Sequence, residues 1–265
     1  MMYFIYFIIF ILGASIGSFL NVVIDRLPRG QSITNPPSHC PECNRKLRAW
    51  DMVPVLSYVW FRGHCRYCGA YIPVRTLLIE VLTGVLVLAL FLYHGGGTYW
   101  GITAFYTFLL LAVAVIDLEH GIIPNKITYP ALPVCLGLSA IYLPLQDHVW
   151  LGAVGLPHLA AVISALAGGG LGFFLFSVIA LVSPGGMGWG DVKLVAVMGF
   201  MTGFPLILVA LGISIILGGL SAAGMLILRR KGRKEAIPFG PFLCLGTFAT
   251  LLWGGSILNW YIGLF

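Results

Sequence analysis

The sequence predicts an all-α polytopic membrane protein of about eight transmembrane helices with a small cytoplasmic loop like a zinc ribbon. The first observation is composition: of 265 residues, 59% are hydrophobic and only 9% are charged, with a mean hydropathy of +0.98. This balance excludes an ordinary soluble domain. The second is a series of apolar segments of span length. The third is a single polar stretch, 25–73, which contains four of the six cysteines.

The predicted spans follow the breaks in hydropathy, because about 20 apolar residues cross about 30 Å of hydrocarbon. The eight segments are 2–24, 74–93, 99–117, 126–145, 156–182, 190–202, 204–228 and 239–262. The first is interpreted as a retained span, since no basic region precedes it and no small-residue cleavage site follows it. The predicted domains are the first helix, 1–24, the cysteine loop, 25–73, and a catalytic bundle, 74–265.

Charge decides between eight spans and a seven-span alternative in which the short sixth segment continues into the seventh as one broken helix. With eight spans, all fifteen Lys and Arg residues lie in the loops of one side or within a turn of them. Without the break near Gly203, the basic cluster 229–234 would move to the opposite side. The basic side is predicted to be cytoplasmic, with both termini outside. The net charge of +6 therefore reflects topology and contact with anionic lipids, and it does not require a nucleic-acid partner.

The polar loop carries two CxxC pairs, Cys40/Cys43 and Cys65/Cys68, at the spacing of a four-cysteine zinc site. Four thiolates around one zinc ion can fold a loop too small to build its own core, and such a closed site is structural. A redox pair or disulfides are the alternatives, but a cytoplasmic loop is reducing. His39 and His64 each precede a cysteine of the cluster and are expected outside the ligand set. Cys135 and Cys244 are expected to be small core residues.

Two aspartates occupy conspicuous positions. Asp117 closes the apolar run 102–116, and Asp191 follows Gly188-Trp-Gly190. A carboxylate at mid-bilayer costs roughly 2.5 to 3.5 kcal/mol, so one retained near a span is a functional candidate or is paired. In the predicted topology both aspartates emerge at the cytoplasmic face, which predicts an aspartyl protease acting within or beside the membrane.

Two rival classes are a secondary transporter and a scaffold with a zinc ribbon. A transporter needs its coupling carboxylates near the midplane, and a scaffold needs no such pair. Either aspartate alone could also be an ordinary helix-end residue, with Asp191 as an N-cap.

Hydrolysis of an amide by two carboxylates needs one ionised group to take a proton from water and one neutral group to protonate the amide. Asp191 begins a helix and Asp117 ends one, so the helix dipoles favour the ion on Asp191 and the proton on Asp117. Because a coupled pair titrates as a unit, this assignment is a hypothesis. The residues expected around the pair are Gly188, Gly190, Lys193 and Glu80, with Glu119 and His120 as further candidates. Glu80, about two turns into the second span, also fits a hydrogen-bonded interior group.

Several separated motifs carry a resemblance to a known family. They are Gly17-Ser-Phe-Leu-Asn21, the cysteine loop with Pro54-Val-Leu-Ser57, Asp117-Leu with Ile123-Pro-Asn125, Gly188-Trp-Gly-Asp191-Val-Lys193, and Ile237-Pro-Phe-Gly240-Pro-Phe. Together they resemble the type IV prepilin peptidases, also called prepilin leader peptidase/N-methyltransferases. Trp189 and Asp25 depart from residues often found in that family.

The resemblance implies that Asp117 and Asp191 form the catalytic dyad of a bacterial inner-membrane enzyme whose substrates are prepilins and type II secretion pseudopilins. It implies cleavage of a basic leader after glycine at the cytoplasmic face, followed by methylation of the new N-terminus with S-adenosylmethionine. The cysteine loop is typical of bifunctional members, and a monofunctional peptidase is the alternative. The methyltransferase site is not placed, because Gly168-Gly-Gly170 fits close helix packing better than donor binding. The oligomeric state is not indicated.

Overall fold

The computed structural model describes residues 2–143, 156–183, 186–227 and 238–264. In these ranges the chain forms nine α-helices and one short 3-10 helix. Apart from two isolated bridges, the described residues contain no β-structure. The chain divides into two compact units, residues 1–108 and 109–265.

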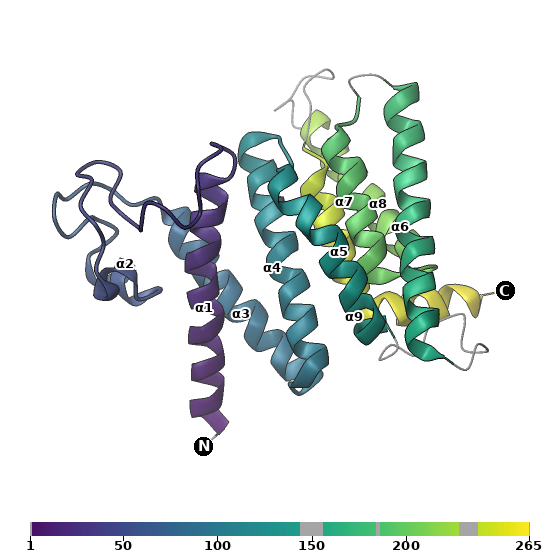
Figure 1. Cartoon of the computed structure of the whole chain (residues 1–265), viewed down its shortest axis with the longest axis horizontal. Coiled ribbons are helices and arrows are strands. Elements are labelled where there is room, and N and C mark those ends of the chain that lie inside the picture. The colour runs from purple at the N-terminus through teal and green to yellow at the C-terminus, as the bar shows by residue number, and fades with distance from the viewer. Residues whose placement is uncertain (1, 144–155, 184–185, 228–237, 265) are drawn as a thin grey trace. The chain divides into compact units, whose positions relative to one another are not determined.

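The first unit is built on α1 (Met2–Arg26) and α3 (Val74–His94), which pack along each other (Figure 1). Glycines allow this close approach: a Cβ on Gly13 would lie 2.9 Å from the carbonyl oxygen of Thr83, and Gly17 meets the same turn of α3. Gly13 and Gly17 are four residues apart, the spacing by which small residues pack membrane helices. Asn21 adds a hydrogen bond of 3.0 Å from its Nδ2 to the carbonyl of Thr76.

The cysteine module, residues 27–73, connects these two helices. It contains the 3-10 helix η1 (Ala49–Met52), the short helix α2 (Leu56–Trp60) and the two CxxC turns.

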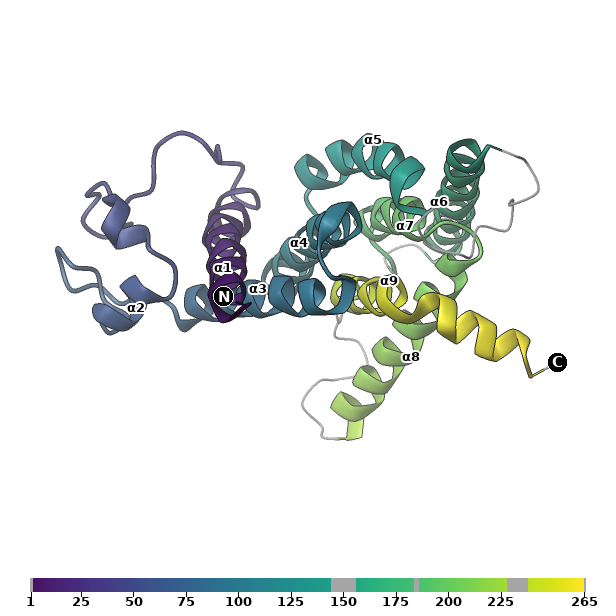
Figure 2. The same ribbon diagram turned by 90° about the horizontal axis from the view of Figure 1, so that it is seen from below.

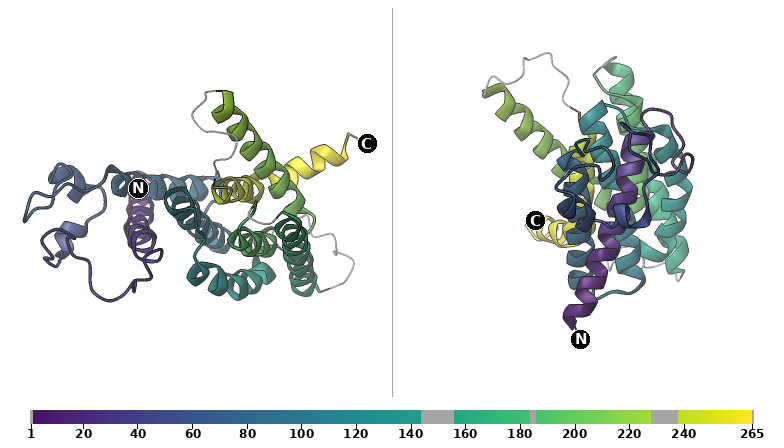
Figure 3. Two further views of the ribbon diagram at one scale, coloured as in Figure 1. Left: turned by 90° about the horizontal axis from the view of Figure 1, so that it is seen from above. Right: turned by 90° about the vertical axis from the view of Figure 1, so that its left-hand side faces the viewer.

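The second unit surrounds a short central helix. It begins within α4 (Gly97–His120) and continues through α5 (Asn125–Tyr142), α6 (Pro157–Val182), α7 (Trp189–Thr202), α8 (Leu206–Ile227) and α9 (Gly240–Ile262). Helix α7 packs against α5, α6, α8 and α9, and most of its residues are buried (Figures 2 and 3). Backbone contact with α6 requires glycine, because a Cβ on Gly199 would overlap the backbone of Gly168 and Gly169. The expectation that these glycines serve helix packing is confirmed for Gly168 and Gly169, whereas a Cβ on Gly170 would meet no atom within 4 Å.

Six of the described helices are long and apolar enough to cross a membrane: α1, α3, α4, α6, α8 and α9. The prediction of eight spans is not confirmed. With 14 residues, α7 is about 21 Å long, short of the roughly 30 Å of hydrocarbon. Helix α5 is continuous but has only 18 residues, with Pro130 and Pro133 inside it, and is not among the six. The predicted break is present, since α7 ends at Thr202 and α8 begins at Leu206. The basic cluster 229–234 lies outside the described residues.

Candidate active site and cysteine cluster

Asp117 lies in the last turn of α4, which continues to His120, so the helix does not end at the aspartate as predicted. The residue is only 5% exposed. Its Oδ2 accepts a hydrogen bond of 3.0 Å from the backbone N–H of Gly240, the first residue of α9. The carboxyl group is therefore fixed by the beginning of a helix distant in sequence.

Asp191 is the third residue of α7, and the N-cap is Gly188. The alternative that Asp191 is only an N-cap is therefore wrong in position. Its carboxyl group interacts with the backbone amides of Gly188 and of Asp191 itself, as an acidic side chain at this position does when it reaches back toward the cap. A Cβ on Gly188 would lie 3.3 Å from Oδ2 of Asp191, so glycine leaves room for the carboxyl group.

The carboxyl groups of Asp117 and Asp191 are near enough to interact electrostatically. Both also lie near the thiol of Cys244, a buried residue in the second turn of α9. The last turn of α4 and the first turns of α7 and α9 therefore converge on one small region of the second unit. Two acids in such a setting have the composition needed for general acid and base catalysis.

Gly190 lies against the loop that follows α4. A Cβ added to Gly190 would lie 2.9 Å from Cβ of Ile123, a separation that ordinary side chains do not show. The glycine thus lets the first turn of α7 approach the segment leading from Asp117 to α5.

Lys193 contacts α5 and not the carboxyl pair. Its Nζ donates a hydrogen bond of 2.7 Å to Oδ1 of Asn125 and lies 4.9 Å from the ring centre of Tyr129. Lys193 therefore links the second turn of α7 to the beginning of α5. Glu119 and His120 are exposed on the surface of the last turn of α4.

Glu80 belongs to the first unit. It is 5% exposed, and its Oε2 accepts a hydrogen bond of 2.7 Å from the backbone N–H of Val55 in the cysteine module. The contact fits the interpretation of Glu80 as a hydrogen-bonded interior group.

The four predicted metal ligands are brought together. The sulfurs of Cys40, Cys43, Cys65 and Cys68 all lie within 4.8 Å of one another, and those of Cys40 and Cys68 are 3.8 Å apart. Four sulfurs placed about 2.3 Å from one zinc ion in a tetrahedron would be about 3.8 Å apart, so the cluster fits zinc. All six cysteines are free of disulfides.

The two CxxC turns have the same local structure. Cys40 N–H donates to the carbonyl of Arg45 and Cys65 N–H to that of Ala70. Each turn is closed by an antiparallel β-bridge, His39 with Lys46 in the first and His64 with Tyr71 in the second. The backbone N–H of Tyr67 is the main cause that lowers the pKa of Cys65 to about 7, which favours its thiolate. The hydrogen bond from the Ala70 amide lowers the pKa of Cys68, but burial and the neighbouring thiols outweigh it and raise that pKa to about 12. The rings of His39 and His64 instead hydrogen-bond to the carbonyls of Pro37 and Arg62.

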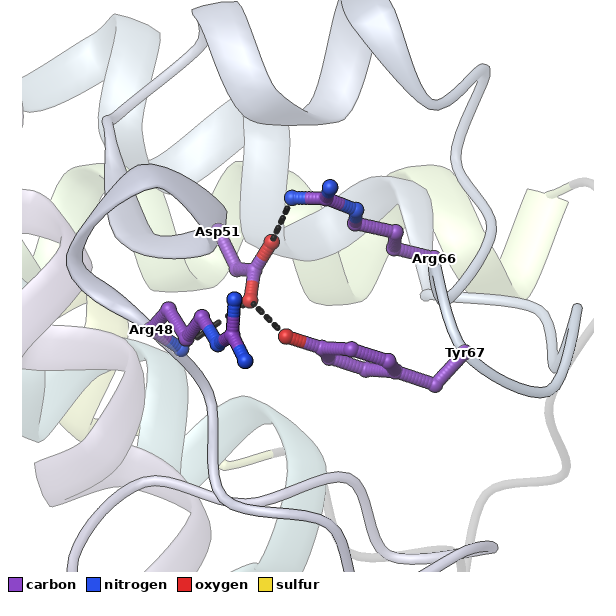
Figure 4. A network of polar contacts seen from close by, with 4 residues as sticks. All are labelled: Arg48, Asp51, Arg66 and Tyr67. Carbon is purple, nitrogen blue, oxygen red and sulfur yellow. Dashed lines mark hydrogen bonds and ion pairs between the residues drawn. The ribbon is translucent and has the colours of Figure 1, made fainter.

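Asp51 fastens η1 to the second CxxC turn (Figure 4). Its Oδ2 accepts hydrogen bonds from the backbone N–H of Arg48 at 2.9 Å and the hydroxyl of Tyr67 at 3.0 Å, and Arg66 lies 3.8 Å from its Oδ1. The Arg48 amide is the largest cause that holds the pKa of Asp51 below its usual value, and Tyr67 and Arg66 add to it. Arg66 and Tyr67 are the two residues between Cys65 and Cys68, so the network orients this turn directly.

Comparison with known proteins gives two family matches that together cover most of the chain. Residues 11–94 match the bacterial peptidase A24 N-terminal domain, and residues 104–223 match the type IV leader peptidase family. The first match contains the cysteine module and Glu80, and the second contains Asp117 and Asp191.

Relatives with named functions align over nearly their whole length. A prepilin leader peptidase/N-methyltransferase of Aeromonas salmonicida is 33% identical over 96% of this chain and 93% of its own. The protein of the same name in Bacillus subtilis is 32% identical over 96% of this chain and 97% of its own. A third, in Legionella pneumophila, is 31% identical over 98% and 96% of the two chains. No solved structure matches the chain.

Proposed function

The chain belongs to the type IV leader peptidase family, and we propose that it is a membrane aspartyl endopeptidase with Asp117 and Asp191 as its catalytic pair. Its proposed substrates are type IV prepilins and type II secretion pseudopilins, from which it removes the leader peptide. One arrangement carries the proposal: the start of α9 binds the carboxyl group of Asp117, and the first turn of α7, which holds Asp191, lies against the loop that follows Asp117.

In the proposed reaction, ionised Asp191 takes a proton from a water molecule, whose oxygen attacks the scissile carbonyl carbon. Asp117 is protonated before the reaction, and it gives this proton to the amide nitrogen as the carbon–nitrogen bond breaks. Oδ2 of Asp117 already accepts the N–H of Gly240, so the proton belongs on Oδ1. The Gly240 amide then holds the acid in one orientation, which is the condition for efficient proton transfer.

The pair is proposed to act at the cytoplasmic face of the bacterial inner membrane, with both chain termini outside. This orientation rests on the side of the Lys and Arg residues. A basic leader would remain on that side for the same reason, so its junction with the apolar pilin helix would lie at the level of the two carboxyl groups.

We further propose that the new N-terminus is methylated with S-adenosylmethionine as donor, in line with the activity that the relatives' names state. The cysteine module would hold a zinc ion through Cys40, Cys43, Cys65 and Cys68. A site closed by four sulfurs leaves no position for substrate, so the ion would serve the fold of the module and take no part in either reaction.

Substitution of each aspartate by asparagine tests the peptidase. In Asp117→Asn the side-chain amide oxygen would still accept the Gly240 N–H, so the variant removes the proton-transfer group and keeps the local hydrogen bond. We expect Asp117→Asn and Asp191→Asn to remain inserted and to leave a synthetic prepilin uncut, as read by mass spectrometry. Complete processing by either variant would refute the proposal. An unmethylated product from the wild-type protein with the donor present would favour the monofunctional alternative.

A further inference from the structure

Helix α2 of the cysteine module presents an apolar face that the described chain does not cover. Leu56, Val59 and Trp60 are three and four residues apart, so they share one side of the helix, and they are 60%, 62% and 83% exposed. The other side is packed through Tyr58, whose hydroxyl donates to the carbonyl of Ile72 at 3.2 Å and lies against Gly63. We call Leu56, Val59 and Trp60 the apolar face of α2.

A buried hydrogen bond sets the depth of this face along α3. The N-cap of α2, Val55, donates its backbone N–H to Oε2 of Glu80. Glu80 is six residues beyond the first residue of α3, or about 9 Å along the helix axis. Because α3 is one of the candidate spans, the start of α2 is held beside the first turns of a membrane helix and not beyond its end. Within the first unit, Figure 1 shows α2 at a level between the two ends of α1 and not beyond the C-terminal end of that helix.

The backbone at this anchor is constrained. Val55 has a φ of +63° and a ψ of −52°, and a positive φ is unfavourable for a β-branched residue. Such a conformation persists only where the surroundings fix it, and the Glu80 hydrogen bond supplies that restraint. The position of α2 is thus a defined feature of the unit.

The charge around α2 is strongly positive. Between residues 25 and 75 there are eight Lys and Arg residues and three carboxylates. Two of those carboxylates are engaged within the chain, Asp25 with Arg75 and Asp51 with Arg66. The guanidinium of Arg66 lies 5.9 Å from the ring centre of Phe61, which directly follows α2. Arg66 therefore lies beside the end of α2, in a segment with an excess of five positive charges.

We propose that α2 is an interfacial helix whose apolar face enters the boundary between lipid headgroups and acyl chains, while the neighbouring cations bind anionic headgroups. Tryptophan favours this boundary, and basic residues near it are attracted to anionic lipid. Two observations favour lipid as the partner of this face. Helix α2 begins alongside a membrane span, and the net positive charge of the module complements an anionic surface. The proposal concerns the first unit and does not depend on leader cleavage.

Fluorescence of the full chain in lipid nanodiscs tests this placement. The signal of Trp60 is obtained as the difference between the wild type and Trp60→Phe, in discs of phosphatidylethanolamine and phosphatidylglycerol. We expect this component to be quenched by lipids brominated near the headgroup end of the acyl chain and to resist aqueous acrylamide. In the double variant Leu56→Ser/Val59→Ser, the same component should become several-fold more accessible to acrylamide. Ile33→Ser, which changes an exposed apolar residue of the module outside α2, is the matched control and should leave it unchanged.

Three outcomes would overturn the contact with lipid, and a fourth would overturn only the role of anionic headgroups. Quenching of Trp60 by acrylamide and not by brominated lipid would show a water-exposed face. Protection that appears only with added prepilin would assign the face to substrate, and protection that requires two chains per disc would assign it to a second copy. Equal lipid quenching in anionic and purely zwitterionic discs would overturn the part played by anionic headgroups. Unchanged zinc content of the variants serves as the check that the module is folded.

Discussion

The backbone N–H of Gly240 donates a hydrogen bond of 3.0 Å to Oδ2 of Asp117, a residue 123 positions earlier in the chain. A Cβ at position 240 would lie 2.6 Å from that oxygen. The first turn of α9 can therefore approach the carboxyl group only because residue 240 is glycine. The same approach brings Cys244 to the carboxyl pair.

Replacing Gly240 with alanine should disable the proposed peptidase without preventing insertion. The added methyl group must displace the Asp117 carboxyl or the start of α9, and a misplacement of about 1 Å in a catalytic group can reduce the rate about 100-fold. We expect kcat for leader cleavage to fall by about that factor, measured with a synthetic prepilin in nanodiscs.

Gly219→Ala is the matched control, because a Cβ at that position in α8 would meet no atom within 4 Å. Its activity should equal that of the wild type. If Gly240→Ala also cleaves at the wild-type rate, Asp117 does not depend on the contact with α9.

The contact between Gly190 and Ile123 can be tested by a loss of cleavage that only one second substitution should reverse. Gly190→Ala would place its Cβ 2.9 Å from Cβ of Ile123 and should reduce cleavage by separating the first turn of α7 from the loop after α4. Only Ile123→Gly removes the opposing Cβ, so the double variant Gly190→Ala/Ile123→Gly should recover activity, whereas Gly190→Ala/Ile123→Ala should not. A cycle of single and double variants measures this coupling. Equal recovery with glycine and alanine at position 123 would contradict the contact.

These two glycines show what the sequence could and could not predict about the site. Asp117 and Asp191 could be selected as candidates because carboxylates are rare in so apolar a chain. The partner of Asp117 could not be derived, since no periodicity relates residue 117 to residue 240. The motif Ile237-Pro-Phe-Gly240 was the available signal, but a glycine at the start of a predicted span also fits an ordinary helix start.

The fold was predictable to the level of its apolar segments. The cysteine cluster followed from spacing, because each CxxC turn is local in sequence. The number of spans was not predictable in this way, since hydropathy does not distinguish a spanning helix from α7, which is buried among other helices although it has only 14 residues. For Glu80, sequence placed the carboxylate in a span but could not show its hydrogen bond to Val55, which joins α3 to the cysteine module.

Loss of the zinc ion should leave leader cleavage intact. The purified wild type should contain about one zinc ion per chain, held by four sulfurs, as measured by elemental analysis. Cys65→Ser should lose the metal and unfold the module, and with it methylation, because the cysteine loop is typical of the bifunctional members of the family. Leader cleavage should persist in this variant, because the cluster belongs to the first unit and the carboxyl pair to the second. Cys135→Ala, which changes a cysteine in α5, should keep the metal. Stoichiometric zinc in Cys65→Ser would show that the four sulfurs are not the ligands.

Loss of the Asp51 carboxylate should loosen the second CxxC turn at neutral pH. Asp51→Asn removes the charge that faces Arg66 and weakens the hydrogen bond from Tyr67, and hydrogen bonds to charged groups contribute roughly 1.5 to 3 kcal/mol. We expect amide hydrogen exchange in residues 48–68 to accelerate by about tenfold, corresponding to about 1.4 kcal/mol of local opening free energy. Tyr67→Phe, which removes one of the contacts, should have a smaller effect.

The effect of Asp51→Asn on amide hydrogen exchange should depend on pH, and the direction in which the pKa of Asp51 is shifted predicts how. The pKa of Asp51 is lower in the folded module than its usual value, chiefly because of the Arg48 amide. Its stabilising contribution is therefore fully present above the unfolded pKa of about 3.9 and is lost as the pH falls through the folded pKa. Exchange in the wild type and in Asp51→Asn should thus differ by a constant factor between pH 7 and pH 5.5 and converge in strong acid, where the carboxyl group of the wild type is also neutral. A difference that grows on acidification would mean that the charge of Asp51 does not stabilise the turn.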